Sequence, residues 1–320
     1  MERVGMSSWQ KYFRTLGLGL GFLLFMREIW RVSNLLVEKS LYFPRTGYLL
    51  LLGASLVSAS AYFVQILSWD MIMRYIGVPL SPRHAVQGYP ITFLPRYIPG
   101  SIWGYWSRSE WLKESHSISY ADSFLASSLE TILFALTALS LVTSGVAFYS
   151  SGVKRVVLGS ISGGLIVLMG LGIPRLIFKI RQQPSYQQTA PCIHSWYMAV
   201  ALSVLLLYLH GSTVYLTSLA VWPASSINLI GATYITSLAI FLGFVFIFVP
   251  AGIGVREAVL SSALVNRFGI PPEQASLIAI AFRFWVILAE VEWIVVGLAS
   301  YRHMWLRKGL KEIALYDRHK

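Results

Sequence analysis

A series of long apolar segments most strongly constrains how this chain can fold. A helix that crosses a hydrocarbon core of about 30 Å needs about 20 mostly apolar residues. Six segments meet this requirement, and a seventh, at 15–30, is shorter and contains Arg27 and Glu28 near its end. No small-residue cleavage site follows it, so we expect a retained anchor rather than a signal peptide. The expected spans are residues 15–30, 49–69, 124–148, 156–173, 197–222, 227–249 and 275–298.

The composition agrees with a membrane protein. Hydrophobic residues make up 56% of the 320 residues and charged residues only 12%, whereas soluble domains have about 25% charged residues. The formal net charge of +12 is spread over short connections between apolar segments, which argues against nucleic acid as a partner. We therefore predict an all-α polytopic membrane protein with about seven transmembrane helices.

Two further apolar segments, at 88–111 and 250–257, are interrupted by proline and glycine. Irregular backbone at membrane depth leaves peptide groups unpaired, and it is tolerated only where protein or a water-filled cavity covers it. Surface loops and proline-kinked spans are the alternatives. We predict instead that each segment is a re-entrant hairpin whose tip lines a site. The tips would lie at Pro99, Gly100, Pro250, Gly252 and Gly254.

The two interrupted segments occur in similar surroundings. Each follows a clean span, and an alanine lies 22 residues after Pro99 and 25 residues after Pro250. A charged residue comes 9 and 8 residues later, Glu130 in one case and Arg283 in the other. We predict two repeats, at about 47–150 and 195–301, in a single transmembrane domain of residues 1–320. Two crossings lie between them, so the repeats would be inverted.

Loop charges predict the orientation of the chain in the membrane. With the N-terminus inside and each hairpin returning to its own side, 17 of the 26 lysines and arginines face the cytoplasm, as the positive-inside rule requires. The basic tail at 302–320 then lies inside as well, provided that 227–249 does not cross the membrane fully. A full crossing there would put the six basic residues of the tail outside, and we reject it for that reason. We expect a prokaryotic inner-membrane protein with both termini in the cytoplasm. The basic residues between Arg27 and Arg45 fall outside and do not fit this scheme.

Few ionisable residues fall at membrane depth, where each costs about 2.5 to 3.5 kcal/mol on insertion scales. Glu130 and Arg283 lie within spans, and Arg96, Arg256 and Glu257 flank the two tips. Together they would form a cationic, partly neutralised cavity. Guanidinium groups bind phosphate through two parallel hydrogen bonds. We therefore predict that these five residues bind the headgroup of an anionic phospholipid or a polyprenyl-phosphate lipid.

Structural roles are the alternatives for the same residues. Glu130 and Arg283 hold matched places in the two repeats and could form a buried ion pair that fixes packing. Glu257 could stabilise the start of a helix after Gly254, where the helix dipole is positive. Glu290 lies further along the last span, and we expect it to be solvated.

Residues for catalysis or metal binding are not evident. Cys192 is the one cysteine, so it can form neither an intrachain disulfide nor a cysteine-based metal site. The six histidines lack the spacing of a zinc site. No nucleophile with a neighbouring base and no ATP-binding loop stands out. We predict no cofactor, no metal and no enzymatic activity.

The interrupted segments resemble the lysylphosphatidylglycerol synthase transmembrane-domain family, a group of flippase-like membrane proteins. The resemblance rests on residues 96–103 (RYIPGSIW), Glu130, residues 252–258 (GIGVREA) and Arg283, and it extends over about 15–301. Ala251 departs from the family, in which glycine more often follows the proline, and this change would stiffen the second tip. The resemblance implies a protein that moves or presents an anionic lipid or a lipid-linked sugar.

Two functions therefore remain. The first is a flippase-like transporter that binds a lipid in a cationic cavity between the hairpins and translocates it by alternating access. The second is a non-catalytic membrane subunit that presents a lipid to a separate glycosyltransferase or lipid-modifying enzyme. Homo-oligomerisation is open in either case.

Overall fold

The structure, a computed structural model, describes most of the chain as helices. It covers Met26, Trp30 and residues 45–97, 102–181, 192–246 and 250–317, with the backbone alone from residue 301 onward. The expected first span at 15–30, apart from two of its residues, and the first hairpin tip at Pro99 and Gly100 lie outside this part.

In the described part of the chain, four helices are long and apolar enough to cross a membrane, which confirms an all-α polytopic membrane fold. The third is interrupted by a single π-helical turn, η3 (Leu168–Gly172), which joins α6 (Gly152–Val167) to α7 (Ile173–Arg181). The other three are α2 (Arg45–Tyr75), α5 (Tyr120–Phe148) and α8 (Ile193–Val221).

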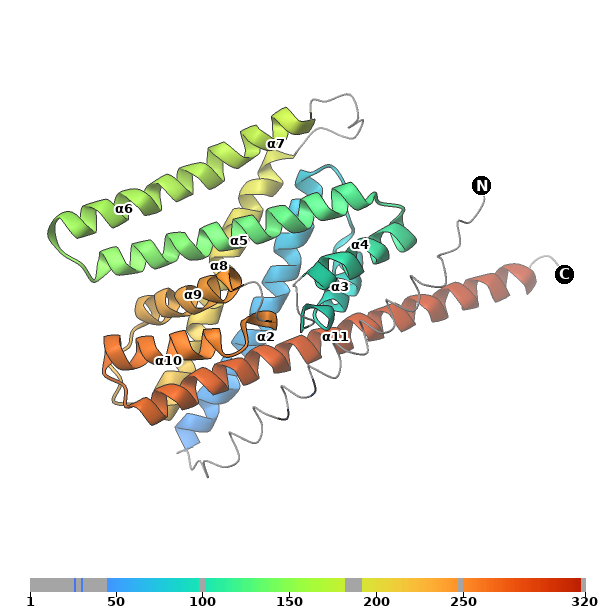
Figure 1. The fold of residues 1–320 in the computed structure, drawn as a ribbon. Coiled ribbons are helices and arrows are strands. Elements are labelled where there is room, and N and C mark those ends of the chain that lie inside the picture. Colours follow the sequence, from blue (N-terminus) through green and yellow to red (C-terminus); the bar gives the residue numbers. More distant parts are fainter. Residues whose placement is uncertain are drawn as a thin grey trace.

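A fifth long helix, α11 (Pro272–Asp317), contains the expected span at 275–298. Its apolar part carries Arg283, Glu290 and Glu292, which lowers its hydropathy relative to the four other long helices. The same helix continues into the basic tail, and Figure 1 shows its C-terminal end reaching beyond the bundle.

Each interrupted segment folds into a short helical hairpin. The first hairpin consists of α3 (Pro82–Gly88), η1 (Pro90–Thr92), η2 (Pro95–Tyr97) and α4 (Ile102–His116). Proline begins each of its first three elements, because proline needs no hydrogen-bond partner for its nitrogen and has a helical φ. The second hairpin consists of α9 (Leu229–Val245), η4 (Pro250–Gly252) and α10 (Val255–Phe268).

The expected span at 227–249 forms this shorter helix, α9. It has 17 residues, which is about 26 Å of helix and less than the usual hydrocarbon thickness. It runs back along α10, and Figure 1 shows the two arms side by side.

The helices α2 and α8 make the most extensive contact in the bundle. Small residues lie in this contact, and Ser68 of α2 lies 3.3 Å from Ser203 of α8, oxygen to oxygen. Such residues let helix backbones approach closely in a membrane, where the hydrophobic effect does not drive helix association. The two hairpins and α11 lie against this pair, and η2 of the first hairpin contacts η4 of the second.

Candidate functional site

A cavity of about 580 Å³ lies between the two hairpins and the long helices. Much of its wall is apolar, from side chains such as Phe134, Leu206, Phe241 and Phe244. Its charged wall groups are Arg96, Arg108, Glu130, Arg256, Arg283 and Glu290.

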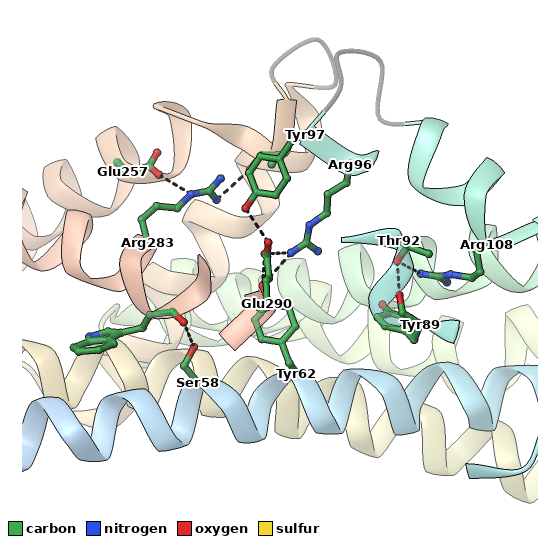
Figure 2. A network of polar contacts seen from close by, with 12 residues as sticks. Ser58, Tyr62, Tyr89, Thr92, Arg96, Tyr97, Arg108, Glu257, Arg283 and Glu290 are labelled. Atoms are coloured by element: carbon green, nitrogen blue, oxygen red, sulfur yellow. Dashed lines mark hydrogen bonds and ion pairs between the residues drawn. The ribbon is translucent and has the colours of Figure 1, made fainter. Parts of the chain in front are cut away.

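Glu290 of α11 is the centre of the first polar cluster, which Figure 2 shows. Its side chain is 1% exposed, and its two oxygens each accept a hydrogen bond of 2.8 Å, from Tyr62 of α2 and from Tyr97 of η2. Arg96, also of η2, forms an ion pair with Glu290 and donates to the Tyr62 hydroxyl at 3.1 Å. The expectation that Glu290 is solvated is therefore wrong, because three partners satisfy its buried carboxylate.

Arg108 and Glu130 form the second polar cluster. An Nη of Arg108 lies 2.6 Å from the Glu130 carboxylate, and Tyr89 donates a hydrogen bond to the other oxygen of Glu130. The guanidinium of Arg108 also lies 4.2 Å from the Tyr89 ring centre and 5.0 Å from that of Trp69. These contacts compensate for the burial of a charged group that is 4% exposed.

Arg283 and Glu257 form the third cluster. Nε of Arg283 lies 3.6 Å from a Glu257 oxygen, and Nη1 donates to the Ala251 carbonyl at 3.4 Å. Glu257 also accepts a 2.6 Å hydrogen bond from the backbone nitrogen of Gly254 at the start of α10. The interpretation of Glu257 as a helix-start residue is thus confirmed.

The structural alternative for Glu130 and Arg283, a buried ion pair between them, is wrong. Each residue has a nearer partner, Arg108 for Glu130 and Glu257 for Arg283. The two side chains do not meet, because each hairpin supplies its own counter-charge, Arg108 from α4 and Glu257 from α10.

Arg256 differs from the other three arginines. Among the described residues, no carboxylate lies within 4 Å of it. Its buried Nε has no hydrogen-bond partner in this part of the chain, which is also true of Nε in Arg96 and Arg108. Its side chain lies in a slot between Gly243 of α9 and Gly252 of η4. A Cβ at these glycines would lie 2.5 Å and 2.8 Å from Nε. The guanidinium faces the Phe244 ring at 5.4 Å.

The charges of these groups do not cancel. Three arginines pair with Glu290, Glu130 and Glu257, whereas Arg256 has no carboxylate partner in the described part of the chain. Counted over the described residues, the site therefore carries one positive charge in excess within a largely apolar wall. Such a wall strengthens the attraction of a cation for an anion, because water screens it less.

The structure brings four of the five predicted headgroup residues to the cavity wall, namely Arg96, Glu130, Arg256 and Arg283. The fifth, Glu257, is not part of the cavity wall and instead contacts Arg283, which is. Of the predicted tip residues that are described, Gly252 lines the cavity and Pro250 and Gly254 flank it.

Sequence reasoning missed Arg108 and Glu290. Arg108 is one of the 17 basic residues that the charge count places at the cytoplasmic face, although it lies four residues after Gly104 in an apolar, tryptophan-rich segment. Glu290 was assigned to the solvated end of its span. The signal that could have found it is its spacing of seven residues from Arg283, which puts both on one face of a helix.

The fold and the cavity together define a class: a polytopic helical membrane protein with an arginine-lined internal cavity. The model of the family described as the lysylphosphatidylglycerol synthase TM region matches residues 15–289. The chain therefore belongs to this family. A comparison with curated proteins finds no match.

Proposed function

We propose that this protein binds an anionic phospholipid or polyprenyl-phosphate lipid by its headgroup and translocates it across the membrane. The observation that carries the proposal is Arg256, which has no carboxylate partner among the described residues, in a cavity whose other arginines each have one. A phosphate beside Arg256 would neutralise the excess charge and fill the hydrogen-bonding capacity of its guanidinium. The apolar remainder of the wall suits the start of the acyl or prenyl chains.

The contacts of α11 suggest how binding is coupled to movement. Glu290 holds the first hairpin through Tyr97 and Arg96, and Arg283 holds the second through Ala251 and Glu257. A phosphate that approaches Arg96 or Arg283 competes with the carboxylate already there. Binding would therefore loosen one hairpin from α11, which is the change that alternating access requires.

The proposal includes the membrane arrangement expected from the sequence. The two hairpins are re-entrant, they belong to inverted repeats at about 47–150 and 195–301, and their tips meet near the middle of the bilayer. The contact between η2 and η4 supports this arrangement, as does the position of the charged groups beside that contact. Both termini face the cytoplasm.

Reconstitution into liposomes tests the proposal. A fluorescent phosphatidylglycerol in the inner leaflet should become accessible to an impermeant quencher in the presence of the wild-type protein. We expect Arg256→Gln to lower the initial rate about tenfold or more, since it removes a charge-assisted contact. Lys113→Gln, which changes an exposed lysine of α4, should keep the wild-type rate.

The same experiment separates transport from lipid presentation. If the wild-type protein binds the lipid but the leaflets exchange no faster than in protein-free liposomes, the transport proposal fails. The protein would then be a membrane subunit that presents lipid to a glycosyltransferase or another lipid-modifying enzyme. If neither binding nor exchange depends on Arg256, both versions fail.

A further inference from the structure

A second pocket lies apart from the central cavity and shares none of its wall residues. Its volume is about 340 Å³. It lies where the turn between α5 and α6 meets α9 and the C-terminal end of α10, at the end of the bundle away from the hairpin tips. The polar residues of its wall are Tyr149, Ser150, Ser151, Lys154, Tyr234 and Arg267.

Two cations line this pocket, and no carboxylate among the described residues does so. Arg267 is held in place: its guanidinium lies 4.9 Å from the Tyr149 ring centre, and Nη2 donates to the Tyr149 carbonyl at 3.4 Å. Tyr149 is in turn fixed by a 2.9 Å hydrogen bond from its hydroxyl to Asn228. The pocket therefore offers a positioned guanidinium and a flexible ammonium from Lys154.

The start of α6 borders the same pocket through Ser151 and Lys154. Its first turn follows Ser151, whose side chain makes no capping hydrogen bond. The amide groups of this turn thus keep free hydrogen-bonding capacity at the positive end of the helix. Hydroxyls of Ser150, Ser151 and Tyr234 surround the same space.

We propose that this pocket is a second binding site, specific for a phosphate group. Guanidinium, ammonium, hydroxyl and helix-start amide groups are the donors that recognise phosphate in proteins. Apolar side chains at Phe148 and Val153, which are 55% and 79% exposed, flank the pocket. This border suits a lipid headgroup, whose phosphate has the same chemistry as free inorganic phosphate. The proposal does not rest on the transport function.

A rival explanation is purely structural. A basic residue in the last turn of α10 is favoured by the helix dipole, and Arg267 also stabilises the α5–α6 turn through Tyr149. That explanation accounts for Arg267. It accounts neither for Lys154, which makes none of these contacts, nor for the uncapped start of α6 in the same pocket.

Native mass spectrometry with two lipids that differ only in phosphate tests the site. Dioctanoyl phosphatidic acid and dioctanoylglycerol are titrated separately into the detergent-purified full chain. We expect two molecules of phosphatidic acid on the wild-type protein and no specific binding of the glycerolipid. Lys154→Gln with Arg267→Gln should weaken one of the two sites about tenfold. Arg256→Gln should weaken the other.

Controls separate this site from the central cavity and from misfolding. Lys113→Gln removes an exposed lysine elsewhere and should bind as the wild type does. Arg267→Lys keeps the charge and should retain most of the binding. The unfolding temperature of each variant, measured without lipid, shows whether that variant is folded. The wild type could also bind only one molecule of phosphatidic acid. If Arg256→Gln alone loses that molecule, the second site is refuted. If it is lost in the double variant alone, the second site stands and the central headgroup site fails.

An inorganic phosphate arm identifies the source of the phosphate. If phosphate raises the unfolding temperature of the wild type and not of the double variant, the pocket accepts free phosphate. If phosphatidic acid binds there and inorganic phosphate has no effect, the ligand is a lipid headgroup. Equal binding of phosphatidic acid to the wild type and the double variant would overturn the proposal.

Discussion

The guanidinium of Arg283 lies 5.7 Å from the centre of the Tyr97 ring. Arg283 belongs to α11 and Tyr97 to the first hairpin, while Arg283 also binds the Ala251 carbonyl in the second hairpin. One side chain of a long helix therefore contacts both hairpins where they meet. The contacts of Glu290, seven residues later, attach the first hairpin to the same helix.

The Glu290 cluster predicts a specific effect of removing its charge. Glu290→Gln should lower the unfolding temperature, because it leaves the Arg96 charge without its partner, and breaking a buried ion pair costs about 3 to 5 kcal/mol. An anionic lipid should then stabilise the variant more than the wild type, since its phosphate replaces the lost carboxylate. Thermal unfolding in detergent, with and without phosphatidylglycerol, measures both effects.

Glu292→Gln is the matched control, because Glu292 is exposed on the same helix. It should change the unfolding temperature little. Equal losses in the two variants would contradict the structural role assigned to Glu290.

The pair of Arg108 and Glu130 predicts non-additive stability changes. Arg108→Leu or Glu130→Leu alone should lower the free energy of unfolding by about 3 to 5 kcal/mol, because each leaves a buried charge unpaired. The double variant should be clearly less destabilised than the sum of the two. A double-mutant cycle by chemical denaturation checks this, and strict additivity would show that the two charges do not interact.

Ala251 has a backbone φ of +50°, in the left-handed region that costs a non-glycine residue about 1 to 2 kcal/mol. Ala251→Gly should therefore stabilise the protein by about 0.5 to 1 kcal/mol, after the extra chain entropy of glycine is subtracted. Ala258→Gly, in the regular helix α10, should instead destabilise it by about 1 kcal/mol. Unfolding temperatures of the two variants test this, and a loss of stability in both would contradict the strained conformation at Ala251.

Much of the fold could be predicted from the sequence. The apolar segments at 49–69, 124–148, 156–173 and 197–222 coincide with long helices to within one residue, because about 20 apolar residues have few stable alternatives in a membrane. Short helices also break at the prolines and glycines of the two interrupted apolar segments, while the re-entrant path of these hairpins stays a prediction. The role of Glu257 at the start of α10 could also be predicted, because this residue comes three positions after Gly254 in the sequence.

Partnerships between distant charges could not be predicted. Glu130 contacts Arg108 rather than Arg283, and Arg96 contacts Glu290, which is 194 residues away. Such pairs depend on how the hairpins lie against α11, and hydrophobic periodicity does not encode this. Arg108 was missed for the same reason, since its charge resembles that of a loop residue until Glu130 and two aromatic rings surround it.

Labelling of Cys192 tests the proposed orientation. This exposed cysteine lies just before α8, which the orientation places at the cytoplasmic face. In intact cells an impermeant maleimide should not label it, and permeabilisation should make it reactive. Labelling of intact cells at the rate seen after permeabilisation would reverse the orientation.

The most direct measurement of the central claim is mass spectrometry of the lipids that co-purify with the protein from its native membrane. We predict that one anionic phospholipid or polyprenyl-phosphate lipid is enriched in the wild type and in Lys113→Gln. The same lipid should fall to the bulk membrane level in Arg256→Gln. Equal enrichment in all three proteins, or bulk lipids alone in all three, would contradict the claim that Arg256 binds a lipid headgroup.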